Sequence, residues 1–151
     1  MKSQAAMLAG LCAALLCACA PSEPPRPKGP LSEDRTAAFK SMMPEFASMG
    51  KMVKEEEPYD VEKFKQAAAA FVESSKKPFT LFDSDPEGNG RALPAVWSDQ
   101  AKFKADQETF LTAVEKLNAA AQTGKLDEIR PAYEAVGMSC KTCHDTFRAP
   151  E

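Results

Sequence analysis

The stretch Cys140-Lys141-Thr142-Cys143-His144, near the carboxyl end of the chain, restricts the fold more than any other feature of the sequence. It has the form C-x-x-C-H, the attachment motif of a c-type haem. Residues three and four positions apart share one face of a helix, so both cysteines and His144 can face the same side. The two thiols can then add to the haem vinyl groups as thioethers while the imidazole ligates the iron. His144 is the only histidine of the sequence, so no other imidazole competes for that role.

Other uses of this motif fit the sequence less well. A structural zinc site takes four cysteine or histidine ligands, and the other three cysteines all lie near the amino end of the chain. A redox-active C-x-x-C accompanies a βαβ pattern, and the sequence has no strand pattern. A plain disulfide would leave the adjacent histidine unexplained. The sequence therefore predicts one haem c, covalently bound through Cys140 and Cys143, with His144 as the axial ligand of the iron.

Residues 1–18 have the pattern of a targeting segment, in which Lys2 precedes an apolar stretch too short for a transmembrane helix. Leu16-Cys17-Ala18-Cys19 resembles a bacterial lipobox, which predicts a lipoprotein-type signal peptide over residues 1–18 and lipidation of Cys19. The alternative is soluble export with cleavage directly before Pro21, which resembles a poor substrate for the ordinary signal peptidase. Both take the chain out of the cytoplasm. The lipobox predicts a membrane-anchored lipoprotein in the periplasm of a Gram-negative bacterium.

Residues 19–30 are predicted to form a tether, because the run from Ala20 to Pro30 contains five prolines and favours an extended polyproline-type conformation. A merely disordered terminus is compatible with the same composition.

Residues 31–151 are predicted to form a single domain. The whole chain carries 19 basic and 22 acidic residues, and this slightly acidic balance argues against a nucleic-acid partner.

Apolar residues recur three and four positions apart from residue 31 onward, which predicts four amphipathic helices over 32–57, 60–77, 98–122 and 126–148, with a long loop at 78–95. Ser32 and Ser98 are the predicted N-caps of the first and third helices, and Gly124 the stop signal of the third. Pro44 predicts a kink inside the first helix. The predicted core consists of Phe39, Met42, Phe46, Met49 and Val53; Val61, Phe64, Ala68 and Phe71; Phe103, Phe110, Val114, Leu117 and Ala121; and Leu126, Ile129, Tyr133, Val136, Cys140, Cys143 and Phe147.

Four such helices predict an all-α, antiparallel up-down-up-down four-helix bundle with covalently bound haem beside its interior. Because the first and fourth helices run antiparallel, Phe39 comes to a height similar to that of His144. Phe39 is therefore the candidate to cover the open face of the iron, and its alternative role is that of an ordinary core aromatic. Arg35, one turn earlier, is a candidate partner for a haem propionate, and its alternative role is that of a solvated surface charge.

These residues also carry a resemblance to the cytochrome c′ family over residues 31–151. The matching segments are Arg35-Thr36-Ala37-Ala38-Phe39, Pro58-Tyr59-Asp60, Val96-Trp97-Ser98-Asp99 and, most specific, Val136-Gly137 followed by Cys140 to Arg148. The resemblance implies a periplasmic four-helix bundle, often a homodimer, in which one histidine ligates the haem iron and which binds nitric oxide and carbon monoxide. It implies a vacant sixth position covered by the residue matching Phe39, where low-spin relatives have methionine, and it places Arg148 near the proximal face of the haem. The lipobox with its tether, and Pro44, depart from the usual member.

Three functions fit these features: a nitric oxide binder, an electron carrier with redox-protein partners, and a non-catalytic haem-based gas sensor. A phenylalanine cannot ligate iron, so Phe39 favours a five-coordinate iron that binds small gases. Met42 and Met43 lie about one turn further along the helix, so ligation by either would displace Phe39. A low-spin, methionine-ligated electron carrier is the alternative. No acid/base pair, nucleophile or phosphate-binding loop is evident, so the sequence predicts a protein that is not an enzyme.

Overall fold

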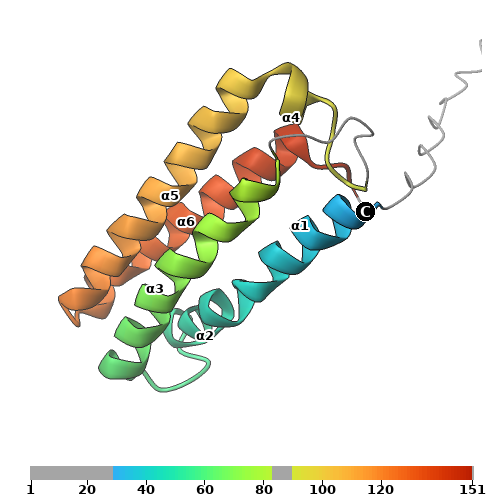
Figure 1. The fold of residues 1–151 in the computed structure, drawn as a ribbon. Helices are drawn as coiled ribbons and strands as arrows, with labels where there is room; N and C mark the ends of the chain where they lie inside the picture. The colour runs from blue at the N-terminus through green and yellow to red at the C-terminus, as the bar shows by residue number, and fades with distance from the viewer. Residues whose placement is uncertain (1–28, 83–89, 151) are drawn as a thin grey trace, which may run out of the picture.

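The computed structural model describes residues 29–82 and 90–150. Its helices, drawn in Figure 1, are α1 (Pro30–Ser41), α2 (Met43–Val53), α3 (Val61–Lys76), the 3-10 helix η1 (Lys77–Leu81), α4 (Ala95–Ser98), α5 (Gln100–Gln122) and α6 (Leu126–Phe147). The predicted signal peptide of residues 1–18, the lipidation site Cys19 and the tether up to residue 28 lie outside the described residues. None of the helices within the two described ranges combines the length and the apolar character that a membrane span requires.

The long helices form an antiparallel bundle in which α1 followed by α2 takes the place of one rod (Figure 1). α5 packs along α6 and α3, and α2 packs against α3 and α6. α1 packs mainly against η1 and less extensively against α3. In the described part of the chain, extended pairing is confined to an isolated antiparallel bridge between Ala92 and Arg148. The predicted all-α, up-down-up-down four-helix bundle is confirmed.

The first predicted helix is interrupted at Met42, where α1 ends and α2 begins. Pro44 stands in the first turn of α2, because a proline lacks the N–H that a helix interior needs and its ring clashes with the carbonyl four residues earlier. The predicted kink is thus a break between two helices. The predicted N-cap was wrong: α1 starts at Pro30, a residue suited to the first helical turn, and Ser32 lies buried within the helix.

The carboxyl end of α2 lies at Val53, before the predicted end at residue 57. Glu55 adopts the left-handed backbone conformation, with φ of 62°, which a regular helix does not allow. Arg130 of α6 donates hydrogen bonds to the Val53 carbonyl and to the Glu55 carboxylate. These bonds satisfy a carbonyl that the helix end leaves without an intrahelical partner.

Two aspartates cap the helices that follow. The carboxylate of Asp60 accepts a hydrogen bond from the Lys63 N–H at 3.0 Å at the start of α3. Asp99, not the predicted Ser98, does the same for α5 by accepting from the Lys102 N–H at 3.1 Å. Ser98 belongs instead to the short helix α4, which begins at the end of the predicted loop, and η1 occupies the beginning of that loop. Gly124, with φ of 69°, follows the end of α5 as predicted.

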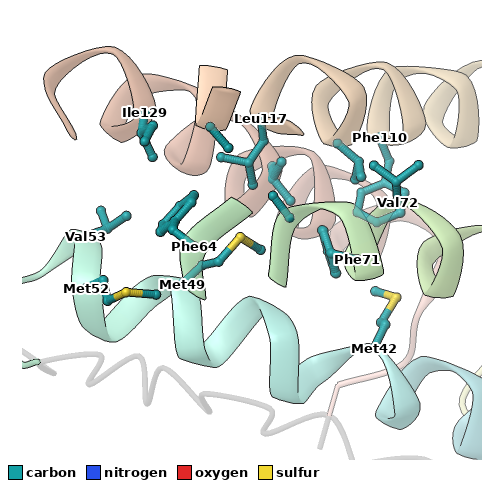
Figure 2. Close-up of a cluster of buried hydrophobic side chains, with 14 residues drawn as sticks. Met42, Met49, Met52, Val53, Phe64, Phe71, Val72, Phe110, Leu117 and Ile129 are labelled. Atoms are coloured by element: carbon teal, nitrogen blue, oxygen red, sulfur yellow. The ribbon is translucent and has the colours of Figure 1, made fainter. Parts of the chain in front are cut away.

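The apolar stripes of the long helices meet in one core, part of which is drawn in Figure 2. Met49 and Met52 of α2 are fully buried there, beside side chains from α3, α5 and α6. Met42, at the break, is 5% exposed and belongs to the same core. Fully burying a side chain of this size contributes about 1.5–3 kcal/mol, so these methionines are firmly held in the bundle interior.

Tyr133 joins α6 to α2 at a point where α2 has a glycine. Its ring stacks on Phe46 with centroids 4.4 Å apart and planes inclined by 12°, and its hydroxyl donates to the Phe46 carbonyl at 3.2 Å. A Cβ atom on Gly50 would collide with the Tyr133 hydroxyl oxygen. The close approach of these two helices therefore depends on Gly50.

Candidate haem-binding site

The C-x-x-C-H motif lies in the last two turns of α6. Cys140 is half-buried and packs against the main core. Cys143 is half-buried against a second cluster whose buried members are Val96, Phe103 and Phe147. Neither cysteine forms a disulfide, and His144 lies beside them with part of its side chain exposed. The helix thus turns its two cysteines towards the bundle, as the predicted core stripe requires.

Burial controls the chemistry of both thiols. It raises the pKa of Cys140 to about 11 and is also the main cause that raises the pKa of Cys143 to about 11. The negative charge of Asp106 raises the pKa of Cys143 further, while Lys102 lowers it. Two protonated, half-buried thiols three residues apart on one helix are a donor set that fits thioether attachment of a haem.

His144 lies in the last turn of α6 beside two arginines. Partial burial is the main cause that lowers the pKa of its imidazole, and the positive charges of Arg148 and Arg91 lower it further. The Arg148 N–H donates to the His144 carbonyl at 3.1 Å, and Arg148 Nη1 lies 3.5 Å from His144 Nδ1. A lowered pKa favours the neutral imidazole, which is the form that ligates metal. The structure therefore brings Arg148 next to the predicted iron ligand.

Arg91 is a neighbour of this site that the sequence patterns did not reveal. Its Nε and Nη2 atoms both donate to the Ala149 carbonyl, at 3.0 and 2.7 Å. The Leu93 N–H donates to the Phe147 carbonyl at 2.9 Å, so the backbone around Arg91 pairs with the end of α6. Arg91 and Ala149 are 58 positions apart, beyond the reach of helical periodicity.

Phe39 lies half-buried on α1 among other aromatic rings. It makes edge contacts with Phe79, at 5.9 Å between centroids, and with Phe82, at 6.3 Å. Phe82 contacts Phe103 at 5.0 Å, and Phe103 contacts Phe147 of α6 at 5.2 Å. A continuous line of rings therefore connects Phe39 with the helix that carries the motif. That Phe39 covers the iron stays a prediction.

Arg35 is 4% exposed, so the alternative role of a solvated surface charge was wrong. Its guanidinium lies 5.2 Å from the Phe82 ring centroid and 5.7 Å from that of Trp97, and Nη1 donates to the Leu81 carbonyl at 3.4 Å. Trp97 is itself held by a hydrogen bond from Nε1 to the Phe82 carbonyl at 3.1 Å. Burying a cation among aromatic rings costs free energy unless anionic or polar groups compensate it. This environment fits the predicted pairing with a haem propionate, which stays a prediction.

Comparison with known proteins agrees with this geometry. The model of the family described as Cytochrome C' matches residues 31–148. Cytochrome c' of Alcaligenes xylosoxydans xylosoxydans is 40% identical over 114 residues, which cover 76% of this chain and 89% of the relative. Cytochrome c' of Rubrivivax gelatinosus is 38% identical over 122 residues, covering 80% of this chain and 95% of the relative.

Solved structures extend the likeness to three dimensions. A ferrous leucine-to-valine mutant of cytochrome c prime from Alcaligenes xylosoxidans superposes with a TM-score of 0.75 at 37% identity, covering 80% of this chain and 94% of that one. The nitric oxide complex of a leucine-to-alanine mutant of the same protein gives a TM-score of 0.76 at 36% identity, with the same coverage. The family match spans most of the chain and ends at the C-x-x-C-H helix, and this chain therefore belongs to the cytochrome c′ family and carries a covalently bound haem c.

Proposed function

We propose that this cytochrome c′ binds nitric oxide at a five-coordinate haem iron. The observation that carries the proposal is the supply of iron ligands: His144 is the only histidine of the chain, and Phe39, the residue predicted to cover the distal side, has no atom that can ligate iron. Met42, Met49 and Met52 are packed in the bundle core, and withdrawing one of them would lose its burial. Met43 is exposed, but it lies about one turn beyond Phe39, so its ligation would displace Phe39. The iron therefore keeps a coordination position for an external ligand.

Each site residue has a role in this proposal. Cys140 and Cys143 hold the macrocycle, His144 ligates the iron from the proximal side, and Phe39 covers the distal side. Arg35 pairs with a propionate from its buried position. Haem, when bound, supplies a one-electron couple and a coordination position for a diatomic gas.

The similar solved structures support nitric oxide as the ligand. They include nitric oxide complexes of two mutants of cytochrome c prime from Alcaligenes xylosoxidans, and a further ferrous variant with bound NO. Carbon monoxide is a second expected ligand. Electron exchange with redox-protein partners is part of the same proposal, because reduction of the iron must precede formation of a ferrous complex. The proposed protein binds and releases its ligand without catalytic turnover.

The sequence also supports a cellular location for this protein. We propose that the chain is exported to the periplasm and anchored through a lipid on Cys19, with residues 19–30 as the tether. The family resemblance also implies a homodimer, although the tether and Pro44 depart from the usual member. Intact mass of the native protein tests the anchor, and a mature amino end beyond Cys19 without acyl mass would contradict it. Sedimentation velocity of the protein in detergent tests the dimer.

Spectroscopy tests the central proposal. Holoprotein matured in a periplasm should give the optical spectrum of a high-spin, five-coordinate haem when ferrous and a high-spin EPR spectrum when ferric. Ferrous protein should form a nitrosyl complex on addition of nitric oxide. Phe39→Ala should speed association of ligands on the distal side, and Phe39→Met should shift the iron towards low spin.

Phe46→Ala is the matched control, because Phe46 is also a half-buried aromatic of the same rod but packs on Tyr133 and Phe71 instead. It should leave ligand association unchanged. A wild-type ferrous spectrum that is already low-spin with methionine ligation would refute the proposal. If Phe39→Ala and Phe46→Ala speed ligand association equally, Phe39 does not control access of ligands to the iron.

A further inference from the structure

Residues 90–93, here termed the strap, connect the start of α1 with the end of α6. Gly90 is buried with φ of 74°, and a Cβ there would collide with the Ser32 hydroxyl oxygen of α1. On its other side the strap forms an antiparallel pair with residues 147–149. The Ala149 N–H donates to the Arg91 carbonyl at 2.8 Å. The strap is therefore held against two helices that are distant in the sequence.

The Arg91 side chain adds a second attachment to the tail that follows α6. Two nitrogens of one guanidinium donate to the single carbonyl oxygen of Ala149, at 3.0 and 2.7 Å. The guanidinium is planar and its donors are fixed relative to each other, so two bonds to one oxygen fix the position of that oxygen relative to the guanidinium. That carbonyl belongs to the residue directly after Arg148.

Arg148 in turn connects the tail to the iron ligand. Its N–H donates to the His144 carbonyl at 3.1 Å, and its Nη1 lies 3.5 Å from His144 Nδ1. On a metal-bound histidine, the partner of the second ring nitrogen sets the orientation of the imidazole. A displaced tail would move this partner away from the ring.

We propose that Arg91 is a positioning residue for the iron ligand, which acts by holding the Ala149 carbonyl and thereby keeping Arg148 against the His144 imidazole. The proposal rests on the proximal role of His144 in the function proposed above. In this proposal, the position of Arg148 depends on the two hydrogen bonds that the Arg91 guanidinium donates, and not on its charge. The charge of Arg91 also reaches His144, together with the charges of Arg148 and Asp145, so the test must separate geometry from charge.

Three variants of the full-length holoprotein make this separation. Arg91→Ala removes both donors and the charge, whereas Arg91→Lys keeps the charge but cannot reproduce the planar pair of donors. Arg130→Ala is the matched control, because Arg130 also donates to a backbone carbonyl at a helix end, that of Val53, the last residue of α2. All three variants lose arginine hydrogen bonds and should be destabilised.

Proton NMR of the ferric protein supplies the readout, since the spread of the haem methyl shifts responds to the orientation of the axial imidazole. Arg91→Ala and Arg91→Lys should both change the spread of these shifts, and Arg130→Ala should leave it unchanged. Amide hydrogen exchange at Arg148 should become roughly tenfold faster in both Arg91 variants, as expected for loss of a restraint worth one hydrogen bond.

Unchanged methyl shifts in Arg91→Ala, or equal changes in Arg130→Ala, would overturn the proposal. An Arg91→Lys variant that matches the wild type would assign the effect to charge and overturn the proposed geometry. These readouts do not involve nitric oxide. A protein that fails to bind nitric oxide but shows the Arg91 effect would refute the proposed function and leave the positioning role standing.

Discussion

Gly50→Ala tests the contact through which the haem-bearing helix α6 packs on α2. Gly50 is buried, and a Cβ at this position would collide with the Tyr133 hydroxyl oxygen and lie 3.1 Å from the ring carbon that carries it. To relieve the collision, Tyr133 must move away from Phe46, on which its ring stacks and to whose carbonyl its hydroxyl donates. The substitution therefore disturbs the packing between α2 and α6.

The expected magnitude follows from three opposing effects. Overpacking of this kind costs about 1–3 kcal/mol. Loss of the hydrogen bond from Tyr133 to Phe46 costs about 1 kcal/mol more. Alanine favours a helix interior over glycine by about 1 kcal/mol and offsets that second cost. The free energy of unfolding should therefore fall by about 1–3 kcal/mol in total.

Tyr133→Phe supplies the background that checks this reasoning. It removes the hydroxyl with which the Cβ collides, at a cost of about 1 kcal/mol for the lost hydrogen bond. In this background Gly50→Ala should cost clearly less than in the wild type. The remaining contact, 3.1 Å to the ring carbon, requires only a small shift of the ring, and helix propensity favours alanine by about 1 kcal/mol. Urea unfolding of the holoproteins, followed by circular dichroism, measures the coupling in a double-mutant cycle. Equal destabilisation of both backgrounds by Gly50→Ala would refute the collision with the hydroxyl.

The other predictions concern the cofactor and the helix ends. Cys140→Ala or Cys143→Ala should weaken stable haem attachment, which acid-acetone extraction measures; haem that extracts freely from the wild type would contradict the covalent assignment. Burial raises the pKa of both thiols to about 11, so in the apoprotein they are protonated at neutral pH and alkylation, followed by mass spectrometry, should accelerate steadily as the pH rises towards that value. Asp60→Ala removes the cap of α3 and should lower the free energy of unfolding by about 1 kcal/mol, measured in urea, whereas Asp60→Asn should retain most of it.

Helical periodicity was sufficient to predict the bundle and its core. The apolar stripes place the same side chains on one face wherever the helix starts, which explains why most of the core was predicted although the ends at Ser32, residue 57 and Ser98 were wrong. The prediction missed Met52, Val72 and Val96, which are buried beside the stripes. Helix ends depend on competition between neighbouring capping groups. Asp99 adjoins Ser98 and takes the capping role, and Pro30 starts α1 before Ser32 can cap it.

The haem motif could be predicted because its chemistry lies within five consecutive residues. The environment of Arg35 could not, because its burial depends on Phe82 and Trp97, which follow it by more than forty positions. The hydrogen bonds from Arg91 to the Ala149 carbonyl could not be predicted for the same reason. Phe82 and Arg91 both lie in irregular segments between helices, where no period relates one residue to the next.

The break at Met42 divides the first rod into α1 and α2, and α1 buries less apolar surface than α2. The buried residues of α1 are Ser32, Arg35 and Ala38, whereas those of α2 include Met49 and Met52. Local opening of a segment costs less free energy when it exposes little apolar surface. α1 should therefore fluctuate as a separate cooperative unit, with amides that exchange with solvent faster than those of α2. Access to the iron would then depend on the opening equilibrium of a whole helix as well as on the rotamer of Phe39.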